Sequence, residues 1–226
     1  GDLLSYTNGG LVAGAPNPIQ AYPGAQVFPG FQPAPKNALD KSRNNKGVYA
    51  DFEAEFGPRL LLGAAGRFEN YSDFGSNFSY KFTGRYKFYQ DFAIRGAIAT
   101  GFRAPSLHQR YFNSVSTQFF GAIPQQVLTV NNDDPIVRAF GIGSLKAETS
   151  NSYSLGLTGK ISELFSFTVD AYQIEVKDRI VLSSAYDRTN STVNNILNAA
   201  GQSANINAVQ FFSNAVSTKT KGLDIV

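Results

Sequence analysis

The 226-residue sequence contains no cysteine, which excludes disulfides, thiol catalysis and zinc–thiolate sites. It has no run of about eighteen apolar residues, so a membrane-spanning helix is not expected. Its 20 basic and 17 acidic residues nearly balance, and a net charge of +3 gives no support for a nucleic-acid partner. The start, GDLLSYTNGG, lacks the basic and apolar parts of a signal peptide.

What the sequence does contain is alternation with a period of two. In VYADFEAEF, from Val48 to Phe56, the apolar residues take one phase and the acids Asp51, Glu53 and Glu55 take the other. The same pattern occurs in five further windows, at 60–70, 78–88, 92–99, 153–161 and 165–172. In all six windows every charge lies opposite the apolar phase, and a seventh window at 209–226 alternates only near its end. The pattern predicts an all-β, antiparallel sheet with one apolar and one polar face.

Alternation is shared by soluble β-sandwiches and membrane β-barrels, so further features must separate them. The connections are tight at one end of the predicted strands (57–59, 89–91, 162–164) and mostly long at the other (72–77, 102–150, 183–208). Aromatic residues gather at both ends of the apolar faces. Small residues such as Ala64 and Gly84 occupy the middle, where a sandwich core needs bulk. These features favour a transmembrane β-barrel in the bacterial cell outer membrane.

The predicted orientation follows from this assignment. Residues expected to face lipid are Phe52, Leu62, Phe82, Ile94, Leu157 and Val169. Residues expected to form the lumen-facing wall are Asp51, Glu53, Glu69, Arg85, Arg95 and Asp170.

About seven strands cannot close a barrel. Single-chain bacterial barrels have an even number of strands, and an open edge in lipid costs several kcal/mol, roughly, for each unpaired backbone group. We therefore expect 46–226 to be a segment of a larger barrel, with extracellular loops near 72–77, 102–150 and 183–208. The Gly- and Pro-rich region 1–45 is expected to be one long extracellular loop.

Several stretches resemble, in order and spacing, barrel segments of TonB-dependent outer-membrane receptors. They are RFENYSDFG (67–75), GFRAPSL (101–107), LKAETS (145–150), DAY with KDRI (170–172 and 177–180), and Asn214 with TKGLD (220–224). The resemblance covers about 41–226 and implies a barrel of about twenty-two strands around an N-terminal plug. It also implies energy-coupled import of a scarce nutrient, such as a siderophore, cobalamin or a glycan.

The partners implied are the TonB complex, reached through a plug domain that this sequence lacks, and a small-molecule or glycan ligand. Outer-membrane lipid and lipopolysaccharide are expected around the barrel. No TonB-contacting segment or terminal aromatic barrel signal is found either, so this chain alone is not expected to transport.

The start of the longest loop holds the candidate ligand-binding or gating residues Arg103, His108, Arg110 and Tyr111. Arginine offers a forked donor to anionic oxygens, and tyrosine offers an apolar plane with a polar tip. The competing interpretation is a structural clasp. Arg103, which continues the phase of Arg95, is expected to pair with a carboxylate of the inner wall or plug, and pairing should weaken at Pro105.

Catalysis is not expected. Ser106 and His108 would share one face of a strand, but no G-x-S-x-G turn or oriented acid accompanies them. A single histidine is a poor metal site, and the turn at 131–135 lacks EF-hand spacing, so no cofactor or metal is expected. The alternative function is a passive porin-type channel, which an open lumen instead of a plug would indicate. An outer-membrane enzyme and a soluble β-sandwich binding module are less favoured.

Overall fold

The computed structural model describes residues 41–202 and 204–226, which form two compact units. The barrel unit comprises Arg43–Pro105, Lys146–Ile180 and Asn214–Val226. The loop unit comprises, within the described residues, 41–42, Ser106–Leu145 and Val181–Ser213. The loop expected over 1–45 lies outside the described residues except for 41–45, and the first strand begins at Asn45.

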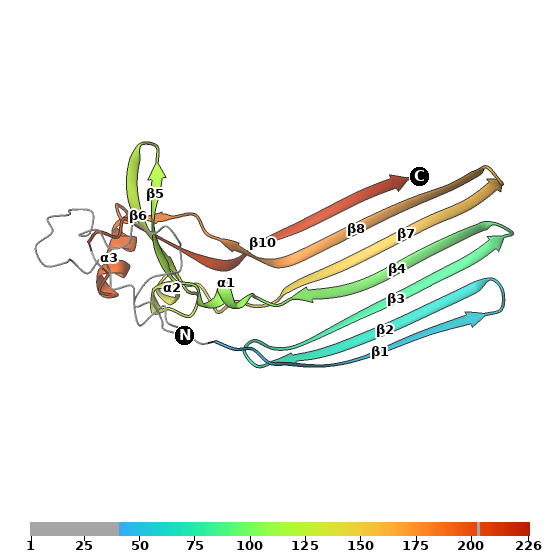
Figure 1. The fold of residues 1–226 in the computed structure, drawn as a ribbon, viewed down its shortest axis with the longest axis horizontal. Coiled ribbons are helices and arrows are strands. Elements are labelled where there is room, and N and C mark those ends of the chain that lie inside the picture. Colours follow the sequence, from blue (N-terminus) through green and yellow to red (C-terminus); the bar gives the residue numbers. More distant parts are fainter. Residues whose placement is uncertain (1–40, 203) are drawn as a thin grey trace, which may run out of the picture. The chain divides into compact units, whose positions relative to one another are not determined.

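Long strands form the barrel unit, and two of them, β8 and β10, continue into the loop unit. They are β1 (Asn45–Phe56), β2 (Leu60–Tyr71), β3 (Gly75–Tyr89), β4 (Phe92–Arg103), β7 (Glu148–Ser162), β8 (Phe165–Leu182) and β10 (Ala208–Ile225). Their order in the sheet is the order in which they occur in the sequence (Figure 1). Among the described residues, β1 has a strand partner on one side only, so the sheet is not closed. The predicted fold class is confirmed as an antiparallel, partial β-barrel.

The strands are longer than the sequence windows that predicted them. Residues 75–77 pair with 69–71, so the link between β2 and β3 is a turn at 72–74, shorter than the loop expected near 72–77. Gly75 has a φ of 96°, which favours glycine at this turn. β4 ends at Arg103, two residues before Pro105, as the missing donor of a proline predicts.

The two faces of the barrel unit differ in chemistry because side chains alternate along each paired strand. One row across neighbouring strands joins Phe52, Ala64, Phe82, Ile98 and Tyr153. Phe52 and Phe82 in this row are 73% and 54% exposed. The adjacent row, on the opposite face, joins Asp51, Ala65, Lys81, Ala99 and Ser152. The apolar and charged side chains therefore occupy opposite faces of one sheet.

The loop unit has secondary structure of its own. Its elements are α1 (Leu107–Tyr111), β5 (Ser114–Phe120), β6 (Ile123–Val130), α2 (Pro135–Ala139), β9 (Tyr186–Asp187) and α3 (Ser191–Ala199). β5 and β6 form a hairpin that turns at Gly121, where φ is 66°. Residues 127–130 of β6 run parallel to 208–211 of β10, and β9 pairs antiparallel with the same part of β10. The regions expected as loops near 102–150 and 183–208 thus fold locally.

An apolar core holds the loop unit together. It consists of Val130, Ile136, Val137, Val193, Leu197, Ile206, Val209 and Phe211. The Asp134 carboxylate caps α2 by accepting a hydrogen bond of 2.9 Å from the Ile136 N–H, and Pro135 follows at the first helical position. Within the described residues, no helix is both long and apolar enough to cross a membrane.

Candidate functional site

The candidate residues His108, Arg110 and Tyr111 lie on the short helix α1 of the loop unit. Ser106 caps this helix: its Oγ accepts from the Gln109 N–H, and its own N–H donates to Gln109 Oε1, both at 3.0 Å. The expectation that Ser106 and His108 share a strand face is wrong, because the capping box starts a helix there. The Ser106 hydroxyl is engaged as a cap, and His108 is exposed.

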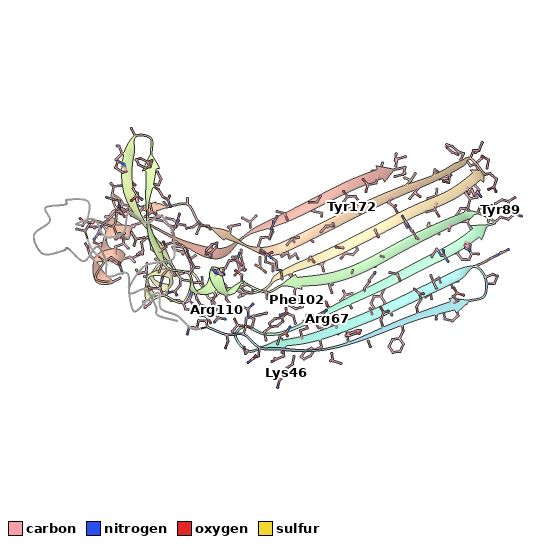
Figure 2. The ribbon with its side chains drawn as sticks, viewed as in Figure 1. Lys46, Arg67, Tyr89, Phe102, Arg110 and Tyr172 are labelled. Atoms are coloured by element: carbon pink, nitrogen blue, oxygen red, sulfur yellow. The ribbon has the colours of Figure 1, made fainter. Side chains whose placement is uncertain are left out.

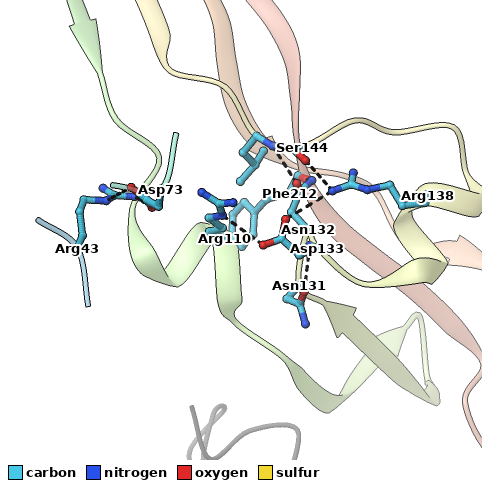
Figure 3. A network of polar contacts seen from close by, with 10 residues as sticks. Arg43, Asp73, Arg110, Asn131, Asn132, Asp133, Arg138, Ser144 and Phe212 are labelled. Carbon is cyan, nitrogen blue, oxygen red and sulfur yellow. Dashed lines mark hydrogen bonds and ion pairs between the residues drawn. The ribbon is translucent and has the colours of Figure 1, made fainter. Parts of the chain in front are cut away.

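Arg110 belongs to a network of polar contacts within the loop unit (Figure 3). Its Nε donates to Asp133 Oδ2 at 3.2 Å, and Asp133 Oδ1 lies 3.5 Å from Arg138 Nη2. Arg138 also donates to the Ile142 carbonyl oxygen at 2.6 Å and to Ser144 Oγ at 2.9 Å. The Arg110 guanidinium lies 5.4 Å from the centre of the Tyr111 ring. This geometry fits a clasp between α1 and the turn at 131–134.

Asn132 anchors that turn and was not singled out from the sequence. Its side chain is fully buried: Nδ2 donates to the Phe212 carbonyl at 3.0 Å, and Oδ1 accepts from the Leu145 N–H at 2.9 Å (Figure 3). Without the Asn132 side chain, the Phe212 carbonyl and the Leu145 N–H would each lose this hydrogen-bond partner. Nothing in the sequence distinguishes Asn132 from its neighbour Asn131. Across the described part of the chain, no three His, Asp or Glu side chains are grouped so as to hold a metal.

In the barrel unit, Arg103 pairs with Glu148 across β4 and β7. Arg103 Nε donates to Glu148 Oε2 at 3.0 Å, and Nη2 bonds Oε1. Glu148, which is 5% exposed, also accepts from the Ile180 N–H at 2.7 Å. This pair lies five residues beyond the row of Ile98 and Tyr153, past the apolar part of the strands. Because Arg103 donates hydrogen bonds to the charged form of the Glu148 carboxyl, the pKa of this carboxyl is lowered below its ordinary value.

Asn214 ties the start of β10's barrel portion to two other segments. Its Nδ2 donates to the carbonyls of Lys146 at 3.0 Å and Asp178 at 2.6 Å, and its Oδ1 accepts from the Lys146 N–H at 2.9 Å. Asp178 has a φ of 55°, which is uncommon for a residue with a side chain. Asn214 and Asp178 both belong to the stretches that carry the family resemblance, and the structure gives them a joint structural role.

The polar wall of the barrel unit contains an ion pair that crosses a whole strand. Arg95 on β4 and Asp170 on β8 are joined by contacts of 3.1 Å (Nε to Oδ1) and 2.5 Å (Nη2 to Oδ2). Between them in register lies Gly156 of β7. A Cβ at Gly156 would lie 2.0 Å from Asp170 Oδ1 and 2.9 Å from Arg95 Nε, so the pair requires glycine at this position.

The other wall residues lie on the same polar face. Glu69 Oε1 accepts from Arg67 at 2.7 Å and lies 3.4 Å from Asn45 Nδ2, while Arg85 is opposite Arg95 in the ladder. Asp51 and Glu53 are exposed on β1. Figure 2 shows side chains along both faces of these strands, with Arg67 and Tyr172 labelled. The structure thus brings Arg95 to Asp170 and Arg103 to Glu148 in the barrel unit, and His108, Arg110 and Tyr111 together on α1 in the loop unit.

The chain is similar to known proteins over most of its length. The family model described as "TonB dependent receptor-like, beta-barrel" matches residues 3–226. The vitamin B12 transporter BtuB of Vibrio cholerae is 25% identical over 169 residues, which are 75% of this chain and 22% of that protein. The ferric enterobactin receptor PirA of Pseudomonas aeruginosa is 25% identical over 215 residues, 91% of this chain and 25% of that protein.

Solved structures share the fold. The crystal structure of the siderophore receptor PirA from Pseudomonas aeruginosa superposes with a TM-score of 0.59 at 20% identity, covering 81% of this chain and 30% of that one. The corresponding protein of Acinetobacter baumannii gives 0.58 at 17% identity, covering 84% and 27%. The chain spans about a quarter of the length of the curated relatives it matches. With the family model matching almost its whole length, this chain belongs to the TonB-dependent receptor family and forms part of the β-barrel domain.

Proposed function

We propose that the chain is part of the barrel wall of an outer-membrane receptor that imports a scarce nutrient by TonB-dependent, energy-coupled uptake. The observation that carries this proposal is the unclosed, two-faced sheet of the barrel unit within a family match over 3–226. Barrels of this family lie in the outer membrane, and the exposed apolar face suits lipid and lipopolysaccharide as its surroundings. The polar face suits an interior that holds a plug domain, through which TonB would act.

The ligand class follows from the relatives. The names of the matched proteins specify vitamin B12 and ferric enterobactin as their ligands. We therefore place cobalamin or a ferric siderophore ahead of a glycan. Transport rather than catalysis is favoured because Ser106 acts as a helix cap and His108 has no carboxylate partner among the described residues.

The interior wall is proposed to face the plug rather than the ligand. Its members are Asp51, Glu53, Glu69, Arg85, Arg95 and Asp170. Arg95 and Asp170 neutralise each other, as do Arg67 and Glu69. Ala65 of β2 lies in register between Asp51 of β1 and Lys81 of β3, and Gly63 of β2 lies between Glu53 and Thr83. A wall that has short side chains at these β2 positions, and whose charges largely balance, leaves room for a folded domain inside the barrel.

Uptake by whole cells tests the proposal. Deleting the gene should abolish uptake of radiolabelled cobalamin or a labelled ferric siderophore at nanomolar concentration. The intact gene should restore uptake only in cells that have TonB and a proton gradient. Restoration that persists without TonB or in the presence of a protonophore would contradict the proposal and favour the passive channel.

Within this receptor we propose that His108 and Tyr111 contact the ligand, while Arg110 acts as the clasp and Arg103 as a wall residue. His108 is exposed, whereas Arg110 and Arg103 already pair with carboxylates. Replacing His108 and Tyr111 with alanine in the complete receptor should weaken ligand binding about tenfold and leave barrel folding unchanged. Thr189→Ala, an exposed change elsewhere in the loop unit, is the control. Unchanged affinity in the double variant would remove α1 from the recognition surface.

A further inference from the structure

Two segments of the loop unit, 106–145 and 181–213, leave the barrel unit and return to it, which makes four crossings between the units. At each crossing the residue on the N-terminal side is buried, with an exposed fraction of at most 7%. These residues are Pro105, Leu145, Ile180 and Ser213. Linkers between independent domains are usually exposed and make few contacts. The crossings are therefore part of the folded structure and not loose tethers.

The Glu148 carboxylate joins three of these crossings. Its Oε2 accepts a hydrogen bond of 3.0 Å from Arg103 Nε, shortly before the first crossing. Its Oε1 accepts from the Ile180 N–H at 2.7 Å, at the third crossing. Glu148 itself follows the second crossing and is only 5% exposed. Because water is largely excluded there, it does not compete for these hydrogen bonds.

The Asn214 amide joins the fourth crossing to the second and the third. Its Nδ2 donates to the carbonyl oxygens of Lys146 at 3.0 Å and Asp178 at 2.6 Å, and its Oδ1 accepts from the Lys146 N–H at 2.9 Å. Backbone pairing between β7 and β8 ends just before this point, at Thr149 and Lys177. Side-chain hydrogen bonds therefore replace the backbone ladder where these strands leave the barrel unit.

The two loop segments are joined to each other by the apolar core of the loop unit. Val130 and Ile136 of this core come from the first segment, and Leu197 and Phe211 come from the second. Neither segment can shift alone without opening the core between them. What remains to be fixed is the arrangement of the four crossings, and the two side chains described above connect all of them.

We infer that Glu148 and Asn214 are positioning residues for ligand recognition by the loop unit. They form a collar that keeps the four crossings in one arrangement before a ligand arrives, and its members are Arg103, Lys146, Glu148, Asp178, Ile180 and Asn214. Without the collar, binding would have to order the crossings, and the lost conformational entropy would lower the affinity. Neither residue contacts the ligand. The inference rests on the role of the loop unit in the proposed function, but not on the identity of the nutrient.

The test measures uptake by whole cells that carry the complete receptor, with labelled vitamin B12 and labelled ferric enterobactin as probes. The variant E148A/N214A should raise the half-saturating concentration about tenfold and leave the maximal rate unchanged. A purely structural role would instead lower the maximal rate, because fewer receptors would fold, and heat-modifiable gel mobility reports the folded fraction. E148A and N214A alone each release one crossing and should raise the half-saturating concentration about threefold, which gives the test if the double variant does not fold.

The matched control is N70A/E163A, which changes the same two residue types in the barrel unit but away from the crossings. Asn70 Nδ2 donates to Ser76 Oγ at 2.7 Å, and Glu163 Oε1 accepts from Lys160 Nζ at 3.0 Å. Its half-saturating concentration and maximal rate should match those of the unmodified receptor. E148Q keeps a side-chain oxygen that can accept from the backbone N–H at the third crossing, so its half-saturating concentration should stay within about twofold of the unmodified value.

Hydrogen exchange of the purified receptor in detergent gives a readout that needs no ligand. In the double variant the amides of Lys146 and Ile180 lose their acceptors, so they should exchange faster while β1 to β3 stay protected. Unchanged exchange at the crossings, an equal rise of the half-saturating concentration in the control, or faster exchange with an unchanged half-saturating concentration would each overturn the inference. Import of neither probe by the unmodified receptor would contradict the proposed function, whereas the exchange measurement would still decide whether the collar holds the crossings.

Discussion

The barrel unit and the loop unit differ in where their large apolar side chains lie. In the loop unit the large buried side chains are mostly apolar, since Phe211 is 1% exposed and Leu197 and Val209 are fully buried, although Asn132 is fully buried as well. In the barrel unit large apolar residues such as Phe52 are exposed, while Glu69 and Glu148 are each 5% exposed. The same chain thus contains one region with an apolar interior and one region with its large apolar side chains at the surface.

The difference shows which forces each unit uses. The loop unit gains stability by removing apolar surface from water, as soluble domains do. The strands of the barrel unit are joined by their ladders and by polar contacts across them, and in the orientation that we propose lipid would solvate their apolar face. The two units should therefore respond differently to the same kind of substitution.

Truncating the loop core should have the largest effect. Phe211→Ala in the complete receptor should cost about 3–5 kcal/mol, because it opens a cavity among packed side chains. Hydrogen exchange should rise through α2 and α3 while β1 to β4 stay protected. Phe119→Ala is the control, since Phe119 is 71% exposed at the hairpin. Equal exchange in the two variants would contradict a packed loop core.

A charge on the apolar face of the barrel unit should come next. Leu157→Arg should cost about 2–4 kcal/mol if this face contacts lipid near the middle of the membrane. Ser154→Arg, on the opposite face of the same strand, should cost less than about 1 kcal/mol. Urea unfolding of the receptor in lipid vesicles measures both. The assignment of the faces fails if the serine variant is the less stable of the two.

A smaller effect is expected at the ion pair that crosses β7. Gly156→Ala should cost about 1–2 kcal/mol because its methyl group displaces the Asp170 carboxylate from Arg95. Gly96→Ala, which meets only ordinary contacts on the other face, is the matched control. If the pair is the cause, Gly156→Ala should cost little further in an Asp170→Asn background. Additive losses would show that backbone strain, rather than the ion pair, explains the effect.

The smallest effect is expected at a surface pair. Lys160 and Glu163 are 3.0 Å apart, but the Glu163 side chain is 91% exposed. Lys160→Ala should change the unfolding free energy by no more than about 0.5 kcal/mol, since water screens such pairs. A loss comparable to that of Gly156→Ala would mean that exposed ion pairs contribute more to this wall than geometry indicates.

The strands of the barrel unit could be predicted from the sequence because alternation of apolar and polar residues is a local signal. Phe78 to Phe88, for example, reveals both the strand and its two faces without knowledge of any partner. The series of motifs, which includes the stretches around Gly101 and Asn214, likewise allowed the family to be predicted from the sequence. Both signals depend on neighbours in sequence.

The loop unit could not be predicted in the same way. Its core joins Val130, Leu197 and Phe211, which are distant in sequence, and its elements are too short to show a clear period. The partners of the site residues could not be predicted for the same reason. Arg103 was expected to meet a carboxylate, but Glu148 was not identified as its partner, and Asn132 gave no sign of its burial. Partners that come from other strands become visible only when the ladder register is known.

The ion pair over Gly156 also has an evolutionary consequence. In related receptors, positions 95, 156 and 170 should vary as a group of three rather than as a pair. Wherever the outer two carry opposite charges, the middle position should remain glycine, and where either charge is lost, larger residues should become acceptable there. A substitution survey of this wall would then find a position that tolerates almost nothing, although it neither binds a ligand nor forms a turn.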